Sequence, residues 1–260
     1  MDEDQILSLC SGIGGLDLGL SVGLRAVGRS PRVVCLVERE AFAVSVMAHQ
    51  MQEGRLDECP IWLGDLRDLP LDELPAIDWI TGGYPCQPFS AAGKRLGEDD
   101  PRHLWPVILD LIGTLRPRGV FFENVAGHLT LGLDRVLRDL AKSGFRCAFG
   151  LFTAEEVGAP HRRERVFILG VADAWSERGR LRDASGQNAE DARQPSRHPW
   201  PARPDQQPNA MEPARTIPSI RRGSYGLPDR VDRLRALGNA VVPQQAAKAF
   251  VTLWKEVARC

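Results

Sequence analysis

The segment Ile6-Leu7-Ser8-Leu9-Cys10-Ser11-Gly12-Ile13-Gly14-Gly15 decides the fold class of this 260-residue chain. Its apolar first half predicts a buried strand, and its second half is a glycine-rich turn. The leucines at positions 16, 20 and 24 then recur at the spacing of one helix face. A strand, a glycine-rich turn and a helix in this order open an α/β fold, and similar alternation continues through the first two-thirds of the chain.

Further elements follow from apolar runs and from apolar residues at helical spacing. Strands are predicted at residues 33–37, 61–63, 77–81, 120–122, 145–152 and 166–171. Helices are predicted around residues 44–47, 104–115 and 133–140, and again after Pro243. The segment from Leu237 to Pro243 is interpreted as a tight turn that leads into this last helix.

Composition excludes several classes of protein. No apolar run approaches the roughly 18 residues needed to cross a bilayer, and the acidic start from Met1 to Gln5 does not resemble a secretory signal. The six cysteines are scattered and form no Cys-x-x-Cys pair, which argues against zinc and against a disulfide framework and suits a reducing cytoplasm. Because the net charge is −1, any nucleic-acid surface must be a local patch.

The composition changes near Ala172, and the chain is rich in Pro, Arg, Gln and Asp from there to about Gly226. Prolines recur throughout this stretch and exclude a long helix and most central strands. We therefore expect a loop-rich insert, ordered in part by a partner.

Cys86 follows the strand predicted at residues 77–81 and lies between two prolines, in Pro85-Cys86-Gln87-Pro88. The carboxyl ends of strands are where α/β sheets place ligands, and stiff flanking residues suit a positioned nucleophile. The alternative is a small, buried and inert thiol.

Two more polar clusters lie at predicted strand ends. Glu123 and Asn124 follow the strand at 120–122, where partial desolvation would raise the pKa of the glutamate and make it a usable proton donor. Arg163 and Arg165 precede the strand at 166–171, and alternation along an extended segment predicts that they share one face, from which they can grip a phosphate. The alternatives are a capping or surface carboxylate and a solvated basic edge.

The glycine-rich turn would allow close approach of an adenosyl ligand. Glu38, at the end of the second strand, suits ribose hydroxyls, and Asp65 could accept a hydrogen bond from an adenine amino group. The turn lacks the full G-x-G-x-x-G spacing, so NAD binding is disfavoured.

Taken in this order, the motifs resemble those of the bacterial and phage C5-cytosine DNA methyltransferases. The resemblance implies an α/β, S-adenosylmethionine-dependent (Rossmann-like) fold: a mixed, mostly parallel sheet with helices on both faces and a small target-recognition insert. The expected division is a catalytic domain over residues 1–171, the insert over residues 172–226, and a segment over residues 227–260 that completes the catalytic domain.

The resemblance also implies residue roles. Cys86 resembles the nucleophile and Glu123 the acid that acts at cytosine N3, with Asn124, Arg163 and Arg165 beside them. The implied cofactor contacts are Cys10, Gly12, Ile13, Gly14, Gly15, Glu38, Asp65, Pro85, Leu104, Asn239, Ala240 and Val241. The implied DNA contacts are Gln87, Ser90, Arg163, Arg165, Arg221 and Arg222. No metal is expected.

The implied cofactor is S-adenosylmethionine, and the implied substrate is a cytosine flipped out of duplex DNA. A monomer in the cytoplasm of a bacterium, encoded by the cell or by a phage, fits the resemblance, with a cognate restriction endonuclease as a further partner. Three departures stand out: Cys10 occupies a position that is usually aromatic, His161 occupies one that is usually glutamine, and the target-recognition region is unusually short.

Two other functions remain open at this point. A binding protein that keeps the fold without catalysis would have no chemical need for Cys86, Glu123, Arg163 and Arg165 together. An RNA cytosine methyltransferase would share these residues, although nothing in the insert resembles that branch.

Overall fold

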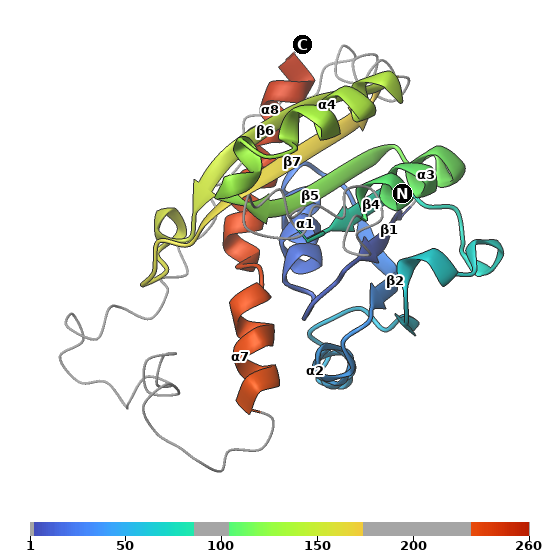
Figure 1. Cartoon of the computed structure of the whole chain (residues 1–260), viewed down its shortest axis with the longest axis vertical. Helices are drawn as coiled ribbons and strands as arrows, with labels where there is room; N and C mark the ends of the chain where they lie inside the picture. Colours follow the sequence, from blue (N-terminus) through green and yellow to red (C-terminus); the bar gives the residue numbers. More distant parts are fainter. Residues whose placement is uncertain (1–2, 86–103, 174–229, 260) are drawn as a thin grey trace, which may run out of the picture.

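The computed structural model describes residues 3–85, 104–173 and 230–259 (Figure 1). Its centre is a seven-stranded sheet in the order β3-β2-β1-β4-β5-β7-β6. The strands are β1 (Asp4–Leu9), β2 (Pro31–Glu38), β3 (Ile61–Leu63), β4 (Trp79–Gly82), β5 (Gly119–Val125), β6 (Phe145–Thr153) and β7 (Glu164–Ala172). The α-helices are α1 (Gly15–Ala26), α2 (Ala41–Gln52), α3 (Trp105–Leu115), α4 (Leu133–Lys142), α7 (Arg230–Asn239) and α8 (Pro243–Arg259).

The sheet is mixed and mostly parallel, which confirms the expected fold class. Strands β3, β2, β1, β4 and β5 pair in parallel, whereas β7 pairs antiparallel with both β5 and β6. The carboxyl ends of the five parallel strands therefore meet at one edge of the sheet. The strand order reverses between β1 and β4, and open α/β sheets bind their ligands beside such a reversal.

Apolar side chains fill both faces of the sheet. One core cluster joins α3 and α4 to the sheet through residues such as Trp105, Ile108 and Leu140. The second joins α1 and α8 through residues such as Leu20 and Phe250. In Figure 1, α4 lies in front of the strands β6 and β7, and α8 runs behind them. Helices thus cover both faces, as the fold class requires.

Helix α8 packs so closely on α1 that two glycines are required at the contact. A Cβ atom on Gly19 would lie 2.4 Å from the Cβ atom of Ala246, and one on Gly23 would lie 2.6 Å from a ring carbon of Phe250. Both Ala246 and Phe250 are fully buried. The helix predicted after Pro243 is therefore confirmed, and it belongs to the same core as the first helix.

Three sequence-based expectations about boundaries are wrong. Strand β5 continues to Val125, so Glu123 and Asn124 lie within the strand, because this part of β5 pairs with the start of β7. Residues 237–239 form the end of α7, a helix that was not expected, rather than a tight turn. Strand β7 begins at Glu164, and Arg163 has a left-handed backbone with φ of 34°, so side-chain alternation does not extend to Arg163.

Candidate active site

A pocket of about 410 Å³ opens at the carboxyl ends of the parallel strands. The turn after β1, the end of β2 and the start of α2 form one side of it. Residues 83–85 after β4, the end of β5 and Arg165 of β7 form another side, and α7 with residues 239–241 completes the wall. The pocket thus lies where the strand order reverses, and it draws on segments from across the described part of the chain.

Most of the residues singled out from the sequence line this pocket. Of the implied cofactor contacts, only Gly14 is absent from its wall, and Glu123, Asn124 and Arg165 belong to it whereas Arg163 does not. The remaining implied site residues lie outside the described residues, and these are Cys86, Gln87, Ser90, Arg221 and Arg222. Pro85, the residue before Cys86, is part of the wall.

Glu38 organises the glycine-rich turn. Its Oε2 atom accepts a hydrogen bond from the backbone N–H of Gly12 at 2.8 Å. Its Oε1 atom accepts from the N–H groups of Arg39 and Glu40 at 2.8 and 3.0 Å. One carboxylate at the end of β2 therefore holds the turn after β1 and the entry to α2.

Gly15 must be glycine because the chain after α7 lies directly against it. A Cβ atom at this position would be 2.3 Å from the backbone oxygen of Val241. By contrast, a Cβ atom on Gly12, which has a φ of 57°, would meet no other atom within 4 Å. The turn is thus packed tightly at Gly15 and has free space beside Gly12.

Asp17 lies beneath the turn, fully buried in the first turn of α1. Its carboxylate accepts hydrogen bonds from Ser8 Oγ at 2.8 Å and from Thr81 Oγ1 at 2.5 Å, which ties α1 to β1 and β4. Burial raises the pKa of Asp17 from 3.8 to about 6, and the two hydroxyl hydrogen bonds offset part of that rise.

The raised pKa of Asp17 predicts a pH-dependent stability that asparagine should remove. The folded protein keeps a proton that the unfolded chain releases near pH 3.8, so this stabilisation is full below that pH and is lost as pH rises through about 6. A shift of this size corresponds to roughly 3 kcal/mol. Urea denaturation from pH 4 to 7 should show the unfolding free energy of Asp17→Asn declining less than that of the parent chain. Parallel curves for the two proteins would contradict this prediction.

Glu123 and Arg165 form an ion pair in the pocket wall. Arg165 Nε lies 2.8 Å from Glu123 Oε1, and both side chains are largely buried. Burial raises the pKa of Glu123, and the positive charges of Arg165 and Arg163 offset only part of this effect. A carboxyl group of this kind can deliver a proton to a ligand in the pocket.

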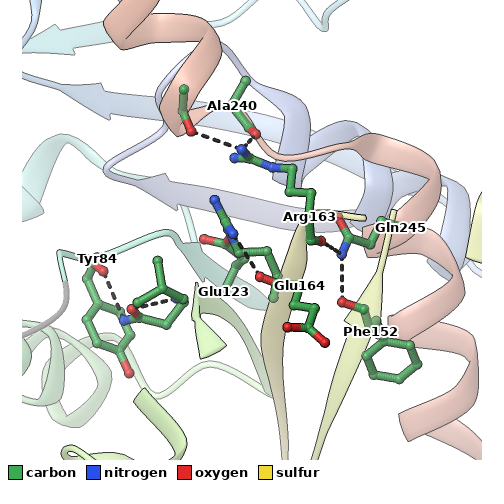
Figure 2. A network of polar contacts seen from close by, with 11 residues as sticks. Tyr84, Glu123, Phe152, Arg163, Glu164, Ala240 and Gln245 are labelled. Atoms are coloured by element: carbon green, nitrogen blue, oxygen red, sulfur yellow. Dashed lines mark hydrogen bonds and ion pairs between the residues drawn. The ribbon is translucent and has the colours of Figure 1, made fainter. Parts of the chain in front are cut away.

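Asn124 and His128 hold the segment that precedes Cys86. The side-chain amide of Asn124 donates to the backbone oxygen of Tyr84 at 3.0 Å (Figure 2). The Tyr84 hydroxyl lies 3.0 Å from Nε2 of His128, and both residues are buried. Burial lowers the pKa of His128, which favours the neutral imidazole. The backbone leading into Pro85 is therefore fixed at two points.

Arg163 and Arg165 have different partners and do not share the common face expected of them. Arg163 donates to the backbone oxygens of Gly238, at 3.0 Å, and of Ala240. Figure 2 shows the side chain of Arg163 reaching toward Ala240, whereas Arg165 pairs with Glu123. The two arginines therefore stabilise different parts of the site.

Several residues of the pocket wall were not predicted from the sequence, including Phe42, Tyr84 and Asp232. Phe42 is a half-buried aromatic residue at the start of α2, four positions after Glu38. Because Phe42 follows so soon after Glu38 in the sequence, it could have been predicted to lie near the same pocket. Cys10, which occupies the usually aromatic position, also lines the pocket, and burial followed by the charge of Glu38 raises its thiol pKa to about 12.

The charge of the wall favours a cationic ligand. Among the described residues the wall carries five carboxylate side chains, on Glu38, Glu40, Asp65, Glu123 and Asp232, and two arginines, Arg39 and Arg165. Within residues 3–85, 104–173 and 230–259, no group of three or more His, Cys, Asp or Glu side chains could hold a metal ion. No α-helix in those ranges has the length and apolar character to span a membrane.

The family model and the similar proteins that match this chain all describe methylases or methyltransferases. The family model described as "C-5 cytosine-specific DNA methylase" matches residues 5–221. A type II methyltransferase, M.HgiCII of Herpetosiphon aurantiacus, is 34% identical over 176 residues, which cover 66% of this chain and 38% of that relative. The orphan methyltransferase M.Rho11sI of Bacillus phage rho11s is 31% identical over 179 residues, covering 66% of this chain and 34% of the relative. The chain thus spans well under half the length of these relatives.

Solved structures resemble the fold over a similar share of the chain. A DNMT2 mutant of Spodoptera frugiperda superposes with a TM-score of 0.54 at 24% identity, over 65% of this chain and 50% of that one. A putative DNA modification methyltransferase encoded within an E. coli prophage gives a TM-score of 0.51 at 25% identity, over 66% and 47%.

Proposed function

This chain belongs to the C-5 cytosine-specific DNA methylase family, and from that premise we propose that it transfers a methyl group from S-adenosylmethionine to carbon 5 of cytosine in duplex DNA. The observation that carries the proposal is the Glu123–Arg165 ion pair. It faces the same pocket as the glycine-rich turn and as Pro85, the residue before Cys86. A proton donor, a cofactor turn and the approach to a cysteine therefore share one pocket.

The pocket fits S-adenosylmethionine by charge and by shape. Its excess of carboxylates suits the sulfonium and ammonium groups of that cofactor. The free space beside Gly12 suits close approach of a ligand, and Glu38 and Asp65 offer acceptors for ribose hydroxyls and an adenine amino group. Phe42 offers an aromatic surface for the adenine where Cys10 offers none. When bound, the cofactor supplies an electrophilic methyl group.

The residues of this chain act on the cytosine ring. The thiolate of Cys86 adds to C6 while Glu123 donates its proton toward N3, so that C5 gains the electron density to attack the methyl group. Arg165 keeps Glu123 oriented and compensates the charge left on its carboxylate. A base then removes the C5 proton, the C5–C6 double bond re-forms as Cys86 leaves as a thiolate, and the N3 proton returns to Glu123.

Reaching C6 requires that the cytosine leave the base stack, at a cost of a few kcal/mol. The proposal includes DNA contacts from Gln87, Ser90, Arg221 and Arg222. It also includes the division of the chain into a catalytic domain that ends at residue 171, an insert that ends at residue 226, and a last segment. The contact of α8 with α1 supports placing the last segment in the catalytic domain. A monomer in the cytoplasm of a bacterium, with or without a restriction endonuclease as partner, completes the proposal.

The test is methyl transfer from labelled S-adenosylmethionine to unmethylated genomic DNA, which contains every short target sequence. We expect label in 5-methylcytosine after digestion of the DNA to nucleosides. Total cellular RNA from a host without the corresponding methylation serves as the competing substrate. Label that appears only in RNA, or no label from a chain that binds the cofactor product S-adenosylhomocysteine, would overturn the proposed activity.

A further inference from the structure

Arg163 is bound to the segment that joins α7 to α8. Its guanidinium group donates to the backbone oxygens of Gly238 and Ala240. Its own backbone oxygen accepts from Nε2 of Gln245 at 2.9 Å, and the same amide donates to the backbone oxygen of Phe152 at 2.9 Å. Figure 2 shows this chain of contacts from Phe152 through Gln245 and Arg163 to Ala240. Arg163 thus connects the end of β6 to the chain after α7.

One carbonyl group that Arg163 binds, that of Gly238, lies in the last turn of α7, and the other, that of Ala240, follows directly after the helix. Helix α7 ends at Asn239, and the last carbonyl groups of a helix have no N–H donor within the helix. They also carry the partial negative charge of the helix dipole, which a cation stabilises. The left-handed backbone of Arg163, with φ of 34°, is rare outside glycine. Buried Gln245 holds the carbonyl of this residue in place.

The segment bound by Arg163 is also a wall of the cofactor pocket. Asn239, Ala240 and Val241 all line the pocket. The backbone oxygen of Val241 lies so close to Gly15 that no Cβ atom would fit between them. Any displacement of residues 238–241 therefore changes the space beside the glycine-rich turn.

We propose that Arg163 is a positioning residue for the cofactor site, which holds residues 238–241 against the glycine-rich turn. This role is distinct from the DNA contact that the resemblance implies for Arg163. The inference rests on the proposed function, because it takes the ligand of the pocket to be S-adenosylmethionine. It differs from a DNA-binding role in one measurable respect: Arg163 matters before any DNA is bound.

The experiment measures binding of S-adenosylhomocysteine by calorimetry, without DNA, to the parent chain, Arg163→Ala, Arg163→Lys and Arg162→Ala. Loss of two charge-assisted hydrogen bonds should weaken binding to Arg163→Ala by about tenfold or more. The affinity of Arg163→Lys should lie between those of the parent chain and Arg163→Ala, because an ammonium group lacks the planar fork that bridges two carbonyl groups. Arg162→Ala is the matched control: Arg162 is exposed, pairs with Glu164, and should bind like the parent chain.

Amide hydrogen exchange provides a readout that does not depend on the ligand. The backbone amides of residues 238–242 should exchange faster in Arg163→Ala and in Arg163→Lys than in the parent chain, while those of β1 and β4 are unchanged. Arg163→Lys keeps the positive charge, so both measurements can be made on this variant if Arg163→Ala fails to fold.

Two results would overturn the inference. In the first, both Arg163 variants bind S-adenosylhomocysteine and exchange their amide hydrogens like the parent chain, but they bind DNA more weakly. The salt dependence of DNA binding would then fall by about one released ion, as expected for a lost phosphate contact. The other is a parent chain that does not bind S-adenosylhomocysteine, which would overturn the proposed function as well. The behaviour of the parent chain therefore separates the two failures.

Discussion

Replacing Cys86 with serine is expected to reduce methyl transfer by at least about 1000-fold, because a hydroxyl group does not ionise near neutral pH and adds poorly to C6 of cytosine. S-adenosylhomocysteine binding and the melting temperature should stay close to those of the parent chain, since the substitution exchanges one atom. Cys59→Ser is the matched control, because burial raises the pKa of the Cys59 thiol to about 12 and keeps it unreactive. The rate is measured as label transferred from S-adenosylmethionine to DNA.

The role of Cys86 as the nucleophile can also be tested by trapping the covalent intermediate. Duplex DNA containing 5-fluorocytosine should become attached to the parent chain and to Cys59→Ser but not to Cys86→Ser, because fluorine cannot leave C5 as a proton. Methyl transfer that survives in Cys86→Ser, or good turnover without any trapped complex, would contradict the covalent route.

Replacing Glu123 with glutamine is expected to reduce the rate by about 100- to 1000-fold, the usual contribution of a positioned acid. Burial raises the pKa of Glu123, so the protonated carboxyl persists at higher pH than it would in water and is lost as the pH rises further. The rate of the parent chain should therefore fall on the alkaline side of its pH profile. Glu123→Gln lacks this titration, so the corresponding limb should be absent from its profile.

The control for this substitution is Glu156→Gln, which removes an exposed carboxylate that pairs with Lys248 and does not line the pocket. It should leave the rate and its pH profile unchanged. If Glu123→Gln keeps the alkaline limb of the parent profile, another group carries the proton and the assignment of Glu123 is wrong.

Local sequence patterns predicted most of the sheet because each strand is a short apolar run in the sequence. Glu38 could be assigned to the pocket on the same basis, since a strand end fixes the position of the next side chain. Residues 61–63 are both the predicted and the observed third strand. The limits of β5 were misjudged because Glu123 and Asn124 are polar, and only pairing with β7 shows that they remain in the strand.

Interactions between distant segments were not predictable in this way. The role of Arg163 depends on its left-handed backbone and on carbonyl groups that lie 75 and 77 positions later in the chain. Asp17 is indistinguishable in sequence from an ordinary acidic residue in the first turn of a helix, although it is fully buried. Helix α7 follows directly on the proline-rich stretch, whose composition suggested that irregular structure continued.

The contact between Gly15 and Val241 has a consequence for the order of events during synthesis. The glycine-rich turn is translated well before the residues that close its open side and before helix α8, which packs on α1. A nascent chain can therefore form the local β1–α1 unit well before it can form a complete cofactor pocket, because non-local contacts must await both partners. A chain that has been translated only as far as the proline-rich stretch therefore lacks residues 239–241 of the pocket wall.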